Sequence, residues 1–107
     1  MMITIEEFKK LDLRIGTVKS AEPHPQADRL LVLTIDLGSE ERQIVAGIRG
    51  HYTPEELLGR QIVVVANLQP AKLRGIESQG MLLAATDGDN IIILGPERKV
   101  DPGAKVS

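Results

Sequence analysis

Alternation of apolar and polar residues over two stretches in the first half most strongly limits what this chain can fold into. From Asp12 to Ser20 and from Leu30 to Leu37 the side chains alternate with the period of two expected for strands. Gly16 interrupts the first stretch and predicts a bulge or a sharp curl there. One face of the second stretch carries only large apolar residues: Leu31, Leu33, Ile35 and Leu37. We therefore expect a strongly curved first strand followed by a half-buried second one.

Further strands follow from β-branched runs bounded by turn residues. Gln43 to Gly47 returns after the turn at Gly38, and Gln61 to Asn67 is rich in valine. The last two predicted strands are Met81 to Thr86 and Asn90 to Leu94, joined by a turn at Asp87-Gly88.

Two short helices are predicted from their caps. Thr4 and Glu7 have the spacing of a capping box, which indicates a helix that ends before Asp12. Thr53, Pro54 and Glu56 mark the start of a second helix, and Gly59 marks its end.

This order of elements predicts an all-β fold, namely a five-stranded OB-type barrel with a short helix between strands three and four. A fragment of a β-sandwich is the alternative. We expect one domain over residues 1–107: an N-terminal helix over 1–11, the barrel over 12–86 and a strand-bearing C-terminal extension over 87–107.

The composition excludes several classes of protein. The chain has no cysteine, and it lacks both a leader pattern at its start and an apolar run that could span a membrane. We expect a cytoplasmic protein with no membrane association. The formal charge is −2, yet residues 42–74 hold five cations and two acids. That local excess allows an anionic partner, although folding could also scatter these cations over different faces.

No enzyme is predicted. Ser78 lacks the glycine two residues earlier that a nucleophile elbow requires, because Ile76 stands there. The two histidines, His24 and His51, are expected to be surface loop residues, without the spacing of metal ligands. No catalytic residue, metal or cofactor is expected.

A binding module remains, and its composition limits how it could bind nucleic acid. Phe8 and Tyr52 are the only aromatic residues, and both are expected to pack against the helices. Stacking on bases, the usual device of single-strand binders, is therefore weak here. A folded RNA recognised through its backbone and shape suits this sequence better. Lys72 and Arg74, in a loop bounded by proline and glycine, are the best candidates for phosphate contacts.

Several ordered motifs resemble the tRNA-binding domain family over essentially the whole chain. They are Asp12-Leu13-Arg14-Ile15-Gly16, the loop His24-Pro25-Gln26-Ala27-Asp28-Arg29-Leu30, the strand from Arg42 to Ile48, and Asn67 through Lys72 to the Ser78-Gln79-Gly80-Met81 motif. Members include the C-terminal domain of bacterial methionyl-tRNA synthetases and free-standing structure-specific tRNA-binding proteins.

The resemblance implies an OB fold, a homodimer supported by the C-terminal tail, and binding to the outside corner of tRNA without sequence specificity. It also implies methionyl-tRNA synthetase as a partner, with the chain acting as its β subunit or in trans. The RNA-binding residues expected are Arg29, Arg42, Asn67, Lys72, Arg74, Ser78, Gln79 and Met81. Gln69 stands where family members often have lysine, which removes one cation from this region.

Two of these positions leave an alternative open: Met81 begins an apolar strand and could be core, and Arg42 could be an ordinary surface cation. The function also has alternatives. A peptide-binding export chaperone family resembles the same barrel, although it departs from both the Ser78 to Met81 motif and the His24 to Arg29 loop. A purely structural tether between synthetase subunits is a third possibility.

Overall fold

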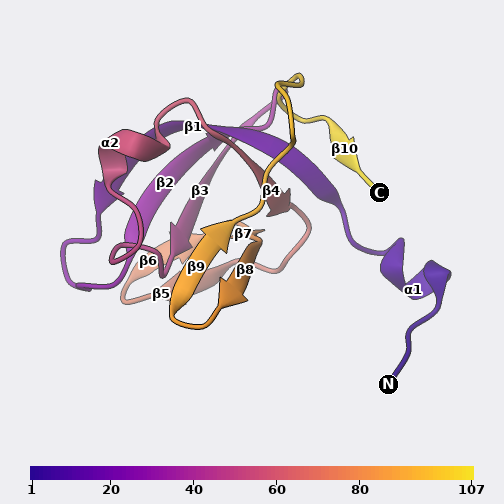
Figure 1. Ribbon diagram of the computed structural model, residues 1–107, viewed down its shortest axis with the longest axis horizontal. Helices are drawn as coiled ribbons and strands as arrows, with labels where there is room; N and C mark the ends of the chain where they lie inside the picture. The colour runs from indigo at the N-terminus through magenta and orange to yellow at the C-terminus, as the bar shows by residue number, and fades with distance from the viewer.

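The computed structural model describes residues 1–107, and its fold is organised by one long strand that pairs along both edges (Figure 1). This strand, β1 (Leu13–Pro23), pairs through its first half with β4 (Gln61–Val65) and through its second half with β2 (Leu31–Asp36). The remaining partners, β3 (Glu41–Ala46) and β7 (Met81–Leu82), extend the sheet in the order β3-β2-β1-β4-β7, all antiparallel. The nearly closed five-stranded barrel confirms the predicted all-β OB fold.

The core lies inside this curled sheet and follows the predicted alternation. Leu31, Leu33 and Ile35 are fully buried in it, as expected for one face of β2. β1 keeps a register shift between Val18 and Ser20, so the irregularity lies just beyond Gly16. Gly16 has a different reason to be glycine, because a Cβ there would lie 2.2 Å from Ile35 Cγ2.

The two helices have the predicted caps. In α1 (Ile5–Phe8) the Thr4 hydroxyl accepts from the Glu7 amide at 3.1 Å, and the Glu7 carboxylate accepts from the Thr4 amide at 3.0 Å. In α2 (Pro54–Leu57) Thr53 is the N-cap, Leu57 is fully buried and Gly59 adopts a φ of 82° where the chain turns away. Neither helix has the length and apolar character needed to cross a membrane.

Two hairpins stand outside the main sheet. One comprises β8 (Ala84–Asp87) and β9 (Asn90–Ile93), joined by a turn at Gly88-Asp89, one residue later than predicted because Asp87 still pairs with Asn90. The other comprises β5 (Ala71–Leu73) and β6 (Ile76–Ser78), and lies in a stretch that the sequence suggested was a loop. The expected strand from Met81 to Thr86 is divided into β7 and β8, because Leu83 leaves the line of the strand to bond Val63 and Leu94.

The C-terminal segment returns to the barrel along the outer side of β1. Its last strand, β10 (Lys105–Val106), pairs with Leu13 and Arg14. The Gln61 side chain also binds both backbone groups of Val100, at 2.7 and 2.9 Å. Leu13 and Ile15 are consequently buried apart from the main core cluster.

Candidate nucleic-acid interface

The β5–β6 hairpin turns through Arg74 and Gly75, whose φ angles are 51° and 90°. A two-residue hairpin turn of this kind requires positive φ at both central positions, which usually selects asparagine or glycine first and glycine second. Arginine in the left-handed region costs on the order of 1 kcal/mol. Arg74 is thus strained at an exposed hairpin tip, and strained residues of this kind cluster at functional sites.

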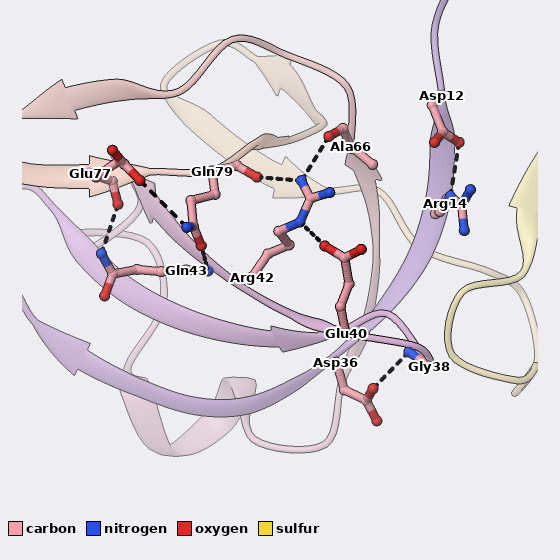
Figure 2. Close-up of polar contacts among 10 residues, drawn as sticks. All are labelled: Asp12, Arg14, Asp36, Gly38, Glu40, Arg42, Gln43, Ala66, Glu77 and Gln79. Carbon is pink, nitrogen blue, oxygen red and sulfur yellow. Dashed lines mark hydrogen bonds and ion pairs between the residues drawn. The ribbon is translucent and has the colours of Figure 1, made fainter.

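The barrel closes where β3 meets the segment from Glu77 to Gln79 (Figure 2). The Gln79 amide donates to the Gln43 carbonyl at 2.7 Å, while the Gln43 amide donates to the Gln79 side-chain oxygen at 2.9 Å. The Gln43 side chain donates to the Glu77 carbonyl at 2.7 Å. Side chains thus supply hydrogen bonds that a regular ladder would obtain from a neighbouring backbone.

Ser78 completes this closure from inside. Its side chain is buried, its hydroxyl accepts from the Val45 amide at 2.9 Å, and it donates to the Gly80 carbonyl at 2.9 Å. We expected Ser78 and Gln79 to contact RNA. In the structure the Ser78 hydroxyl is enclosed and bonded within the chain, so it can shape the site but does not face a ligand.

Arg42 is also committed to the closure. Its Nη1 donates to the carbonyls of Ala66 at 2.8 Å and Gln79 at 3.1 Å, and its Nε binds the Glu40 carboxylate (Figure 2). The guanidinium therefore joins the end of β4 to the closing segment. Arg42 is thus not a free surface cation, because its Nε and Nη1 are bonded within the chain.

Asn67 is used in a similar way at the end of β4. Its Oδ1 accepts from the Asp12 amide at 2.8 Å, and its Nδ2 donates to the Lys10 carbonyl at 2.6 Å. The side chain fastens the segment after α1 to the barrel. One of the two hydrogens of its Nδ2 is used in this way, and the residue is exposed.

Met81, unlike the residues above, is not used to hold the barrel together. Its side chain is 48% exposed, and Leu68 beside it in the lining of the same groove is 40% exposed. Met81 is therefore not a core residue, although its strand pairs with β4. The neighbouring Gly80 has a φ of 140°, and a Cβ there would lie 2.9 Å from the Val65 carbonyl oxygen, so glycine is required at this approach.

An apolar groove of about 380 Å³ runs past Met81. Its walls come from the end of β3, the residues before β5 and the β6–β7 segment, and Ile91 of β9 also contributes. Gly47 and Gln69 lie on this groove as well. The groove thus adjoins the hairpin that carries Lys72 and Arg74.

The predicted cations that remain available are Arg29, Lys72 and Arg74. All three are exposed, and none takes part in the chain's four ion pairs. Arg29 and Arg74 line one concavity of about 300 Å³ between the loop after β1 and the hairpin. Arg74 also donates to the Gln26 carbonyl at 3.1 Å, which links the two segments.

His24 was wrongly expected to be a surface residue. It is only 3% exposed, and its Nε2 lies 3.0 Å from the Leu73 carbonyl oxygen of the hairpin. Its Nδ1 accepts from the Gln26 amide at 3.0 Å. The loop, rich in proline and polar residues, concealed this burial, because the partner on β5 is 49 residues away. His51 is exposed, as expected.

The resolved pKa shifts lie away from the hairpin. The hydrogen bond and charge of Arg14 lower the pKa of Asp12, against the opposing effect of burial (Figure 2). Because this carboxyl has a depressed folded-state pKa, its contribution to stability is present above the ordinary value of about 3.8 and is lost as the pH falls through the lower value. Acid effects between pH 5 and 8 must therefore come from other groups. No cluster of three potential metal-ligating side chains is formed.

A family model described as "Putative tRNA binding domain" matches residues 13–105. Methionine–tRNA ligase of Thermotoga maritima is 63% identical over 105 residues, which are 98% of this chain and 17% of that protein. The chain spans only about 14 to 17% of the length of the curated relatives it matches.

Two solved structures cover nearly all of both chains. The first is a MetRS-related protein from Pyrococcus horikoshii, which is 39% identical to this chain and has a TM-score of 0.94. The match covers 100% of this chain and 99% of that one. The chaperone CsaA from Bacillus anthracis is 37% identical, covers 100% of each chain, and has a TM-score of 0.90.

Replacing Ser78 by alanine tests its structural role. Ser78→Ala removes the acceptor of the buried Val45 amide, so the free energy of unfolding should fall by about 1–3 kcal/mol. Urea unfolding measures the loss, with Ser39→Ala in the exposed turn after β2 as the matched control. A Ser78→Ala protein as stable as the control would contradict the closure role.

Proposed function

The chain belongs to the tRNA-binding domain family, and on that premise we propose that it is a non-catalytic module that binds folded tRNA. The observation that carries the proposal is the set of three exposed cations without acidic partners, Arg29, Lys72 and Arg74, on two segments joined by hydrogen bonds. Three other cations, Arg14, Lys19 and Arg42, are paired with carboxylates. Free cations on a fixed surface suit the phosphates of an RNA backbone.

We propose recognition of shape over recognition of bases. Tyr52 is half-buried, its hydroxyl accepts from the Ile93 amide at 3.1 Å, and the Arg60 guanidinium lies 5.4 Å from its ring centre. Phe8 belongs to α1, outside the hairpin region. Neither ring offers a stacking surface beside Lys72 and Arg74. Contacts to phosphates and sugars can still distinguish a folded RNA by the spacing of its backbone.

Met81 and the residues that close the barrel take different parts in this proposal. Met81 supplies exposed apolar surface beside the cations and can pack against a sugar or a base edge. The protein surface around the cations is held in place by Arg42, Asn67, Ser78 and Gln79. We propose that these four residues affect RNA binding by fixing the shape of this surface. The functional residues thus divide into contacts and supports.

The domain is proposed to work with methionyl-tRNA synthetase, as a subunit or in trans, in the cytoplasm. Methionine–tRNA ligases of several organisms are 50 to 63% identical to the chain, which corresponds to one small part of each. Binding to tRNA without catalysis would let the module raise the local concentration of substrate for a synthetase.

An export chaperone remains the alternative, because the solved chaperone structure has nearly the same fold and an apolar groove could hold a peptide side chain. Identity favours the tRNA function: 63% to a methionine–tRNA ligase against 37% to the chaperone. The Ser78 to Met81 motif and the His24 to Arg29 loop are both kept, which also favours it.

Removing the hairpin cations tests RNA binding. Lys72→Ala/Arg74→Ala should weaken binding to folded tRNA by roughly 10- to 50-fold at about 0.1 M salt, and should lower the slope of log K against log salt by about 1.4–1.8. Fluorescence anisotropy against folded tRNA, unfolded tRNA and single-stranded DNA measures both quantities.

The matched control is Arg98→Ala/Lys99→Ala, which removes the same two residue types from the loop before β10. It should bind nearly as the parent does. If both variants lost the same affinity for tRNA, the loss would be explained by net charge alone and not by the position of the hairpin cations. Equal binding of the parent to all three nucleic acids would contradict shape recognition, and binding only to unfolded peptides would support the chaperone.

We also propose that the chain forms a homodimer through its N-terminal segment, together with the C-terminal extension over 87–107. α1 has only four residues and buries none of them, which is too little to hold a helix in place by itself. Ile3 and Ile5 are more than half exposed, and in Figure 1 α1 stands apart from the barrel. A second copy that covers these side chains would explain why the segment is ordered.

Sedimentation equilibrium tests the dimer. The parent should sediment as a dimer at micromolar concentration, and Ile3→Glu/Ile5→Glu should shift it towards monomer because two charges would be buried in the interface. Ser20→Ala, an exposed change on β1, serves as the control. A parent that is monomeric at about 100 μM would contradict the proposal.

A further inference from the structure

The turn between β1 and β2 is held in place although it belongs to a loop. Within it the Leu30 amide donates to the Ala27 carbonyl at 3.3 Å, so Asp28 and Arg29 are the two central residues of the turn. The amide of Arg49, in the segment after β3, donates to the Arg29 carbonyl at 3.2 Å. Because the turn is bonded to a neighbouring segment, it presents its two charged side chains from a fixed backbone.

The carboxylate of Asp28 is not used by this turn. An aspartate in a turn commonly accepts a hydrogen bond from the amide two residues later. Asp36 does so, because its Oδ1 accepts from the Gly38 amide at 2.7 Å (Figure 2). The amide two residues after Asp28 belongs to Leu30 and donates to the Ala27 carbonyl instead. Asp28 is exposed and takes part in none of the chain's ion pairs, so no contact within the chain accounts for its charge.

Asp28 lines the same concavity of about 300 Å³ as Arg29 and Arg74. The loop between β1 and β2 lies beside the tip of the β5–β6 hairpin there (Figure 1). No ion pair joins the carboxylate to either guanidinium group. Arg74 uses one donor for the Gln26 carbonyl, at 3.1 Å, and keeps others. Two cations and one anionic acceptor therefore remain available to a single ligand.

This mixture of charges limits which ligand can fit. Guanidinium groups bind phosphate well, because their planar set of donors matches the oxygens of the anion. A carboxylate only accepts hydrogen bonds and repels a phosphate, so a purely anionic ligand would suit the two arginines but not Asp28. A ribonucleotide unit suits all three groups, since its phosphate is an anion and its 2′-hydroxyl is a donor close by. Dinucleotide-binding proteins use an acidic residue for the same hydroxyl.

Resting on the proposed function, we propose that Asp28 is the residue through which the domain distinguishes RNA from DNA. Its carboxylate accepts a hydrogen bond from the 2′-hydroxyl of one ribose, while Arg29 and Arg74 hold the adjacent phosphate. DNA lacks this donor, so a bound deoxyribose leaves the carboxylate without a partner beside a phosphate that it repels. The preference depends on the sugar and needs no contact with a base.

Recognition of the hydroxyl and simple electrostatics predict opposite effects of removing this carboxylate on RNA binding. Removal of a negative charge next to bound phosphates strengthens binding to any polyanion, whether RNA or DNA. Loss of a hydrogen bond to the 2′-hydroxyl weakens binding to RNA alone. The ratio of the two affinities therefore reports the hydroxyl, whereas a change common to both ligands reports the charge.

Fluorescence anisotropy with a tRNA transcript and with an all-deoxy copy of the same sequence tests the proposal at constant salt. The parent should prefer the RNA. Asp28→Ala should bind the tRNA about tenfold more weakly than the parent does, and should bind the DNA copy at least as tightly. Asp28→Asn keeps a neutral acceptor, so its affinity for tRNA should fall only about threefold. Any difference in fold between the two nucleic acids is common to parent and variants and cancels in the comparison.

The matched control is Asp101→Ala, which removes the same charge from an exposed position before β10 and should leave the ratio of affinities unchanged. The proposal would be overturned if Asp28→Ala kept the parent's ratio, or if it bound tRNA and DNA more tightly by the same factor. Urea unfolding of Asp28→Ala should match that of the parent. A marked loss of stability would show that the carboxylate serves the fold, and would overturn the proposal as well.

A small ligand separates this inference from the proposed function. Adenosine 3′,5′-bisphosphate and its 2′-deoxy form differ only in the hydroxyl, and the amide chemical shifts of Asp28, Arg29 and Arg74 follow their binding. If the parent prefers the ribose form, Asp28→Ala does not, and the parent fails to bind tRNA, the proposed function is wrong and the hydroxyl site remains. If tRNA binds but the parent prefers ribose in neither pair of ligands, the proposed function stands and this inference is wrong.

Discussion

The structure depends on how the barrel closes, because β3 meets no full-length strand on its outer edge. A regular ladder is missing there, and buried amides without partners would each cost on the order of 1–3 kcal/mol. Glu77, Ser78 and Gln79 satisfy this edge with a mixture of backbone and side-chain groups, and Arg42 ties the closure to the end of β4. A sheet that closes in this way brings the β5–β6 hairpin to one side of the barrel, next to the loop that contains His24.

The closure explains why polar residues interrupt an otherwise apolar stretch. Three of them are structural: Ser78, Gln79 and the backbone of Glu77 before them complete the edge of β3. The remainder, Lys72 and Arg74, are left exposed by the same geometry. The left-handed backbone of Arg74 at the tip has some cost in stability, as is often found at functional sites. The hydrogen-bonding groups at the edge of β3 are satisfied within the chain, whereas these two cations have no acidic partner. Only the cations are therefore available to a polyanion.

Local signals in the sequence predicted much of the fold. They predicted little of which residues support the candidate site and which are left free to contact a ligand. The capping residues Thr4 and Thr53 and the alternation in β2 depend on neighbours in sequence, and the structure confirms them. The turn of the last hairpin was predicted to within one residue. The hairpin was missed because Arg-Gly is an unusual turn pair. The structural uses of His24 and Arg42 were not predictable from their neighbours, since the Leu73 and Ala66 carbonyls that they bond lie 49 and 24 residues away. What separates the proposed contacts from the supports is that Arg29, Lys72, Arg74 and Met81 are exposed, whereas Arg42 is held by Glu40 and by backbone carbonyls.

A titration of isotope-labelled protein with folded tRNA, followed by backbone amide and methyl resonances, tests this division most directly. The account predicts the largest changes at Lys72, Arg74 and Gly75, at Arg29 and at the Met81 methyl. The Val45 and Gln43 amides, which bond Ser78 and Gln79, should shift little and should stay protected from exchange. Large changes at the closing edge with an unaffected hairpin would contradict it, because the polar closure itself would then be the RNA-binding surface.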